Sequence, residues 1–253
     1  MGRKRNSSRR HRRRRFGFLY KILSILAICA VVVVALTLFF KVDTIQVSGQ
    51  SHYTRQQVLS ASGVQPGDNL FLLNKYDAAN RIIEKLPYVE TVRINRKLPD
   101  CLLISVQECT TVFSVSQNGV SWLISPGGKI VDSSKGSAPA PGVPTIDGCT
   151  LLAPSVGSRL AVAQSQESLR TSLLSLLSAL EKAKLTAEVN AVHLGDSSVL
   201  TMDFGGRFSV VMPYGADYPH LLKYLTAVIG TLETNQTGTI DLTKDGEPHF
   251  RPD

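Results

Sequence analysis

Residues 19–40 read LYKILSILAICAVVVVALTLFF. This stretch determines how the rest of the chain is positioned relative to a membrane. Apart from Lys21 it carries no charge, and it contains neither proline nor glycine. Its 22 residues form a helix roughly 33 Å long, which exceeds the hydrocarbon thickness of about 30 Å. A single segment in lipid can satisfy its own backbone groups only as a helix. The sequence therefore predicts one transmembrane helix over residues 19–40.

The charges on either side of this helix predict its orientation. Residues 1–15 contain nine Lys and Arg and no acidic residue, whereas Lys41 and Asp43 follow the helix. Positive charge stays on the cytoplasmic side of a membrane. Residues 1–18 are thus expected to be a basic cytoplasmic tail, and everything from Lys41 onward is expected to lie outside the cell membrane.

A cleaved signal peptide is the alternative reading of the same stretch. The apolar region of such a peptide is about 7–15 residues long and ends at a small-residue cleavage site. Here the apolar run is longer and closes with Phe39-Phe40-Lys41, without such a site. The pattern favours a retained anchor, and the lipid bilayer is an expected partner.

The formal charge of +8 comes from the tail and not from the folded part. Without the nine basic residues of the tail, 28 − 9 = 19 basic residues face 20 acidic ones, so the remainder is near −1. Beside a membrane helix, an Arg-rich tail is better explained by orientation and by contact with anionic headgroups. We therefore expect no nucleic-acid partner.

Residues 41–110 alternate between strand and helix patterns. Thr54 and Gln57 have the spacing of a helix-capping box, and Asn74 precedes a second amphipathic segment. The expected order is strand, helix, helix, strand, strand, over residues 42–47, 54–61, 74–86, 88–96 and 102–108. A sheet with two helices on one face is a sensible small α+β unit.

Residues 111–243 predict a second, β-rich domain with two helices. Asn118-Gly119 between two apolar runs is a strong hairpin signal. Leucines at helical spacing mark a helix over 166–184, and Pro219 opens another. Residues 133–144 are expected to form a loop, and residues 244–253 a polar tail. The expected strands are 112–117, 120–125, 129–132, 187–193, 197–204, 207–212 and 238–243.

Several motifs, taken in order, resemble the FtsQ/DivIB family of bacterial cell-division proteins. They are Val42–Gly49, Gly67-Asp68-Asn69-Leu70-Phe71, Leu86-Pro87-Tyr88-Val89, Arg96-Lys97-Leu98-Pro99 with Leu102, Ile104, Val106 and Glu108, Trp122–Val131, and Ile240-Asp241-Leu242. The resemblance covers nearly the whole chain from the anchor onward. It implies a POTRA domain over 41–110, followed by a β-domain over 111–243. Cys109 stands where the family usually has arginine.

No motif for catalysis is present in the sequence. The five histidines are scattered, and neither H-E-x-x-H, G-x-S-x-G, S-x-x-K nor a phosphate-binding loop occurs. Cys101 and Cys109 would lie too far apart on one strand to bridge each other, while a pairing of Cys149 with either stays open. We expect no enzymatic activity, no cofactor, no metal and no small-molecule substrate.

The resemblance implies a function in the divisome. Such a protein would bind membrane partners of the FtsB/DivIC and FtsL type at the division septum, and through them help to regulate septal peptidoglycan synthesis. The alternative is an envelope assembly or transport module, in which POTRA domains usually occur in tandem ahead of a membrane β-barrel. This sequence has one POTRA-like unit and no succession of alternating lipid-facing strands.

The final predicted strand is the expected partner site. A strand that is followed only by a polar tail tends to lie at a sheet edge, where another chain can add as a strand. The resemblance points to the same place. The candidate residues are Thr239, Ile240, Asp241, Leu242, Thr243, Lys244 and Phe250. The alternative is an ordinary edge strand with a disordered tail.

Overall fold

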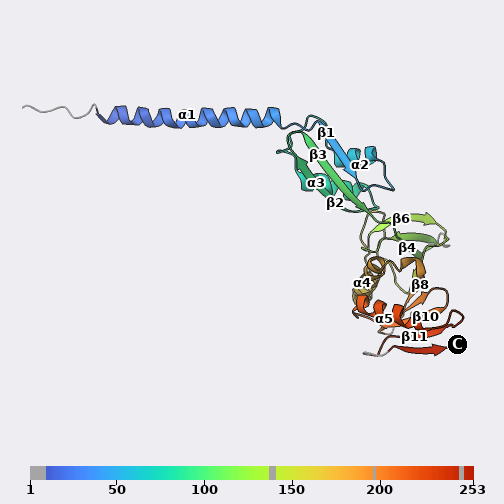
Figure 1. Ribbon diagram of the computed structural model, residues 1–253. Coiled ribbons are helices and arrows are strands. Elements are labelled where there is room, and N and C mark those ends of the chain that lie inside the picture. Colours follow the sequence, from blue (N-terminus) through green and yellow to red (C-terminus); the bar gives the residue numbers. More distant parts are fainter. Residues whose placement is uncertain (1–9, 137–140, 196–197, 245–247) are drawn as a thin grey trace, which may run out of the picture.

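The computed structural model describes residues 10–136, 141–195, 198–244 and 248–253. The first element is α1 (Arg10–Phe39), and residues Tyr20–Thr37 within it have a mean hydropathy of 2.4. None of the residues in this segment is buried by the other residues that the structure describes (Figure 1). The predicted apolar helix is therefore present, and it is long and apolar enough to anchor the chain in a membrane.

A three-stranded unit follows α1 directly. Its elements are β1 (Thr44–Ser48), α2 (Arg55–Ser62), α3 (Lys75–Lys85), β2 (Val89–Lys97) and β3 (Cys101–Glu108). The sheet order is β1-β3-β2, in which β1 is parallel to β3 and β2 is antiparallel to it. The predicted order of strands and helices is confirmed.

The core of the three-stranded unit lies between its sheet and its two helices. Ile82 of α3 and Leu102 and Ile104 of β3 are fully buried in it. The local signals act as predicted: Thr54 and Gln57 form a reciprocal capping box, and the Asn74 side chain accepts from the first backbone amides of α3. These caps satisfy helix-end amides that would otherwise have no partner.

Glu108 fixes the turn between β1 and α2. Its carboxylate accepts hydrogen bonds from the backbone amides of Ser51 at 2.7 Å and His52 at 2.6 Å. Burial alone would raise the pKa of Glu108, but these hydrogen bonds outweigh it and lower the pKa. Gly49 precedes this turn with φ +84°, and a Cβ there would lie 2.1 Å from the Val106 carbonyl oxygen. Only glycine allows so close an approach.

A nine-stranded unit forms the rest of the chain, and its strand order is β12-β11-β10-β9-β8-β7-β4-β5-β6. The strands are β4 (Phe113–Gln117), β5 (Val120–Ile124), β6 (Ile130–Lys135), β7 (Thr145–Asp147), β8 (Val189–Leu194), β9 (Val199–Phe204), β10 (Phe208–Pro213), β11 (Gly238–Asp241) and β12 (His249–Pro252). The helices are α4 (Glu167–Ala183) and α5 (Tyr218–Thr231). With both units mixing helices and sheets, the predicted α+β class is confirmed.

The two helices lie side by side against one face of the nine-stranded sheet (Figure 1). Leu173, Leu176 and Leu180 of α4 and Leu222 and Leu225 of α5 are buried against it. Alternate residues of β9 and β10 face this core, namely Leu200, Met202, Phe204, Phe208, Val210 and Met212. The helical leucine spacing in the sequence therefore predicted the correct face.

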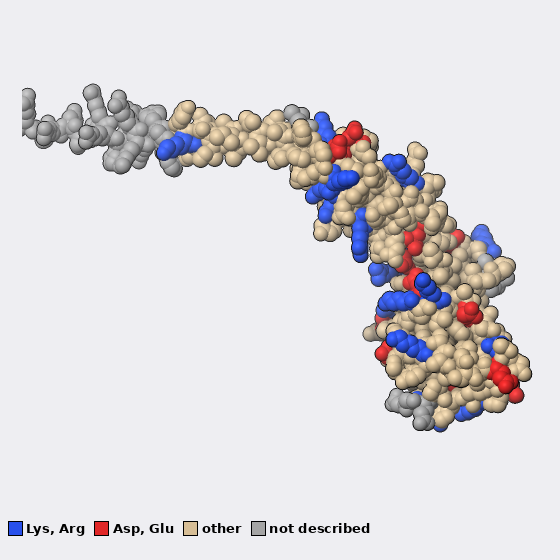
Figure 2. Space-filling model, in the orientation of Figure 1, with Lys and Arg blue, Asp and Glu red and all other residues tan. Residues whose placement is uncertain are grey.

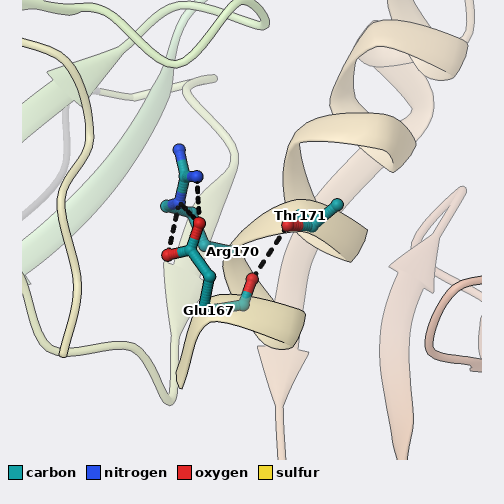
Figure 3. A network of polar contacts seen from close by, with 3 residues as sticks. All are labelled: Glu167, Arg170 and Thr171. Atoms are coloured by element: carbon teal, nitrogen blue, oxygen red, sulfur yellow. Dashed lines mark hydrogen bonds and ion pairs between the residues drawn. The ribbon is translucent and has the colours of Figure 1, made fainter. Parts of the chain in front are cut away.

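The first turn of α4 carries a local polar network (Figure 3). The Glu167 carboxylate pairs with the Arg170 guanidinium, and the Thr171 hydroxyl donates to the Glu167 carbonyl at 2.9 Å. The hydrogen bond from Arg170 lowers the pKa of Glu167. A carboxylate in the first turn also interacts favourably with the positive end of the helix dipole, so this network favours helix initiation at the predicted place.

Three expectations need correction. Two short strands, β7 and β12, were not predicted, and β6 extends to Lys135, into a segment predicted as a loop. The last predicted strand ends at Asp241 and not at Thr243. Strands this short are held by their neighbours in the sheet rather than by their own sequence pattern, which explains why the pattern missed them.

Candidate partner-binding edge

The end strand of the large sheet is β12, and the prediction that β11 lies at the edge is wrong. β11 is parallel to β10 on one side and antiparallel to β12 on the other. Its backbone groups are therefore already used within the sheet. The expected polar tail supplies the true edge strand, His249–Pro252.

Two contacts hold β12 in place. The Phe250 ring lies 6.2 Å from the Phe208 ring in an edge-to-face arrangement. Gly238 lies opposite Pro252, and a Cβ at Gly238 would come within 2.1 Å of the Arg251 carbonyl oxygen. Because Gly238 has no side chain, β12 can pack closely against β11.

The outer side of β12 offers few backbone groups. The Asp253 amide donates to the Thr237 carbonyl at 3.3 Å, and the register pairs Thr239 with Arg251. Hydrogen-bonded pairs alternate in an antiparallel ladder, so Phe250 and Pro252 direct their backbone groups outward. Since proline lacks an N–H, Phe250 supplies the one outward donor within His249–Pro252.

Asp241 closes the end of β11. Its carboxylate accepts from the Thr243 hydroxyl at 2.6 Å and from the Thr243 amide at 3.0 Å. An Arg251 nitrogen lies 3.9 Å from the same carboxylate. The Thr243 side chain, above all, lowers the pKa of Asp241. This carboxylate is therefore ionised at neutral pH and fixes the turn that leads to Lys244.

A pocket of about 360 Å³ lies beside this turn. Lys244 and Pro248 line it on one side, and the start of α5 lines the other. In that wall the rings of His220 and Tyr224 meet edge to face at 4.6 Å. The pocket thus combines the Lys244 ammonium and the Asp217 carboxylate with aromatic and apolar walls.

The structure separates the predicted site residues into two groups. Ile240 and Leu242 are buried in the core of the nine-stranded unit, so their side chains face away from any partner. Thr239, Asp241 and Thr243 are half-buried, Lys244 is exposed, and Phe250 is half-buried over Phe208. The stretch 244–250 was also expected at the site, and its residues 245–247 lie outside the described residues. Sequence reasoning missed Arg251, His220 and Tyr224. The alternation of His249, Phe250 and Arg251 was the available signal.

Reactive groups elsewhere in the described residues show no arrangement for catalysis. Burial raises the pKa of Cys109 to about 12 and that of Cys149 to about 11, so both are neutral thiols. Cys101 is a buried free cysteine. No group of three His, Cys, Asp or Glu side chains among the described residues could hold a metal ion.

Comparison with known proteins gives consistent matches. The family model described as "POTRA domain, FtsQ-type" matches residues 40–108, which contain the whole three-stranded unit. The chain is 30% identical over 206 residues to a cell division protein FtsQ of Syntrophotalea carbinolica, covering 80% of this chain and 70% of that protein. A cell division protein DivIB of Clostridium acetobutylicum is 23% identical over 224 residues, covering 88% of each chain.

A shorter match covers only part of its relative. The chain is 30% identical over 97 residues to a cell division protein DivIB of Clostridium botulinum strain Hall, and the match spans 38% of each chain. These relatives are named as cell-division proteins, and none of their names describes an enzyme.

Proposed function

The chain belongs to the FtsQ/DivIB family of cell-division proteins, and from this premise we propose that it is a non-enzymatic divisome component. In this proposal it binds membrane partners of the FtsB/DivIC and FtsL type, and through them helps to regulate septal peptidoglycan synthesis. α1 anchors it in the cell membrane with residues 1–18 in the cytoplasm. Residues 41–110 and 111–243 are its POTRA domain and its β-domain, both outside.

The observation that carries the proposal is the edge strand β12. Its outer side has no strand partner among the residues that the structure describes, and it lies far along the chain from the anchor (Figure 1). A sheet edge accepts an extended segment of another chain through backbone hydrogen bonds. In this proposal the Phe250 N–H and carbonyl make the central pair of these bonds.

Side chains beside the edge supply specificity. Lys244 and Pro248 lead from β11 to β12 and also line the pocket at the start of α5. A partner segment that runs along β12 therefore passes this pocket. An aromatic side chain of that segment fits it because Tyr224 offers an aromatic ring, while Lys244 and Asp217 offer one charge of each sign. Thr239, in β11, and Thr243, just after it, also contact the partner segment in this proposal.

A pair of substitutions at one position tests the edge directly. Phe250→Ala removes the ring, and Phe250→Pro removes the ring together with the outward N–H. We expect pulldown of a partner of the FtsB/DivIC type to weaken with Phe250→Ala and to be lost with Phe250→Pro. Lys244→Glu should also weaken it. Equal pulldown by both Phe250 variants would show that the outward N–H is not used.

A fold control accompanies these variants. Circular dichroism should show the same secondary structure in all three, because the hydrogen bonds between β11 and β12 do not use the Phe250 N–H. A truncation after Thr243 is less informative, since it removes β12 and uncovers Ile240. Undiminished pulldown in every variant would place the interface elsewhere in the molecule.

The localisation of a fluorescent fusion distinguishes this proposal from an envelope assembly or transport module. A divisome protein forms a band at mid-cell in dividing cells. A uniform signal around the cell envelope would favour the assembly module instead.

A further inference from the structure

Four large apolar side chains are exposed at one end of the three-stranded unit. Phe71 and Leu72 lie in the loop before α3, Tyr76 lies in the first turn of α3, and Leu98 lies in the turn between β2 and β3. Their exposed fractions are 48%, 77%, 76% and 55%. We call these four residues the apolar rim. Scattered exposed apolar residues are normal, but a group at one end of a domain marks an interaction surface.

The first part of the rim lies beside the last turns of α1. The Asn69 side-chain amide donates to the Leu36 carbonyl at 3.1 Å and to the Thr37 carbonyl at 3.3 Å. The Leu70 amide donates to the Phe40 carbonyl at 2.9 Å. Leu36 and Thr37 belong to the membrane-length segment Tyr20–Thr37. A loop in contact with them lies at the depth of the membrane surface.

The second part of the rim lies at the same end because of the sheet topology. The backbone amides of Asp43 and Thr44 both donate to the Asp100 carbonyl, at 2.9 and 3.3 Å. The turn that carries Leu98 is therefore next to the residues that leave α1. The Arg96 guanidinium also donates to the Leu73 carbonyl at 2.8 Å, which joins this turn to the loop before α3.

Aromatic rings connect the rim with the helix. Phe40 meets Phe39 at 5.8 Å and Phe71 at 4.9 Å, both edge to face. The rings of Phe39, Phe40 and Phe71 thus connect the end of α1 with the first part of the rim. Aromatic side chains prefer the interface between hydrocarbon and water.

Charges near the rim are mixed. Figure 2 shows Lys and Arg side chains over the part of the three-stranded unit next to α1, with acidic side chains close by. Close in the chain to the rim residues or to the end of α1 are the basic residues Lys41, Lys75, Arg96 and Lys97 and the acidic residues Asp43, Asp68, Asp77 and Asp100. These eight charges sum to zero, so anionic lipid gains little attraction. The apolar side chains remain as the source of affinity.

We propose that the apolar rim inserts into the interfacial layer of the same membrane that α1 spans. The lipid surface is the occupant because the rim continues directly from the end of the spanning helix. This second contact holds the three-stranded unit against the bilayer and so sets the direction in which the nine-stranded unit projects. The inference rests on α1 as a membrane anchor, and it is independent of any division partner.

Tryptophan quenching in the full chain tests this inference. Trp122 is the one tryptophan of the sequence, so Trp122→Phe gives a dark background. Into it we place Leu72→Trp, and as the matched control Gln65→Trp, an exposed position in the preceding loop outside the rim. Both chains are reconstituted in phosphatidylcholine vesicles with brominated acyl chains. Vesicle flotation first shows that α1 is inserted.

We expect bromolipid to quench the tryptophan at position 72 several-fold more than the one at position 65. Because tryptophan itself favours membrane interfaces, the control carries the same bias. Adding Phe71→Ser and Leu98→Ser to the Leu72→Trp chain should reduce the quenching, and adding anionic lipid should leave it unchanged. Equal quenching at positions 72 and 65 in floated vesicles would overturn the inference. A chain that fails to float would instead refute the anchor.

Discussion

The Nζ atom of Lys129 lies 2.6 Å from the carbonyl oxygen of Ile83, so a side chain of the nine-stranded unit caps a helix of the three-stranded unit. The same ammonium lies 3.4 Å from the Leu86 carbonyl and 3.1 Å from that of Val89. Burial lowers the pKa of Lys129. The ammonium satisfies carbonyls at the end of α3 and so connects the two units.

Lys129→Met should loosen this connection. It keeps most of the aliphatic side chain but leaves the carbonyls at the end of α3 without their donor, at a cost of about 1–3 kcal/mol. We expect a lower urea midpoint and a broader distribution of spin-label distances between the two units. Lys135→Met, at the exposed end of β6, is the matched control. A distance distribution identical to that of the unchanged chain would show that Lys129 does not hold the two units in a fixed relative position.

The three-stranded unit should fold on its own. Residues 41–110 contain its whole core, and we expect a fragment with these bounds to unfold cooperatively in urea. Ile104→Asp buries an unpaired carboxylate at a fully buried position and should cost about 4 kcal/mol or more. Ser105→Asp, on the exposed face of the same strand, should leave the transition nearly unchanged. A fragment without a cooperative transition would show that the unit depends on its neighbour.

His193 should make the stability of the nine-stranded unit depend on pH. Its ring nitrogens lie 2.7 Å from Asp147 and 3.1 Å from Asp203. Burial alone would lower the pKa of His193, but the two carboxylates outweigh it and raise the pKa. The stabilisation is therefore fully present below the ordinary histidine pKa of about 6.5 and is lost as the pH rises through the higher folded value.

Urea midpoints measured between about pH 6 and 8.5 check this pH dependence. The unchanged chain should lose stability as the pH rises, whereas His193→Gln should show a flatter curve. The His220 ring contacts Tyr224 and no carboxylate in the described contacts, so His220→Gln is the control and should keep the slope of the unchanged chain. Parallel curves for all three would exclude the Asp147–His193–Asp203 cluster as the source.

The charges that flank α1 predict its orientation in the membrane. Protease added to spheroplasts should digest the folded units and spare a tag placed before Met1, because positive charge is retained in the cytoplasm. Permeabilised cells, in which the tag is also digested, provide the control. Digestion of the tag in intact spheroplasts would reverse the predicted orientation.

The sequence predicted local features best. The apolar helix α1 and the caps at Thr54 and Asn74 depend on residues close together in the chain, and the structure confirms them. β12 depends on a distant partner, since Gly238 must lie opposite Pro252 before the strand can pair. β12 is short and contains a proline and a charged residue, so its sequence does not show the pattern of a strand. The edge was therefore assigned one strand too early.

The contact between Lys129 and the end of α3 also could not be predicted from the sequence. Lys129 follows a Gly-Gly turn and looked like an ordinary hairpin residue, but its three acceptors lie 40, 43 and 46 positions earlier in the chain. The apolar rim was equally hidden, because Leu72 and Leu98 come together only when β1 pairs with β3. Contacts of this kind arise from tertiary structure and leave no local periodicity.

Site-specific photo-crosslinking in dividing cells tests the central claim most directly. A photoreactive amino acid at Arg251, exposed on β12, should crosslink to a membrane protein of the FtsB/DivIC type that mass spectrometry identifies. The same group at Leu152, an exposed position away from β12, is the control and should not capture that protein. Capture of this partner from position 251 alone is the predicted result. Equal capture from both positions, or capture of no division protein from position 251, would contradict the account.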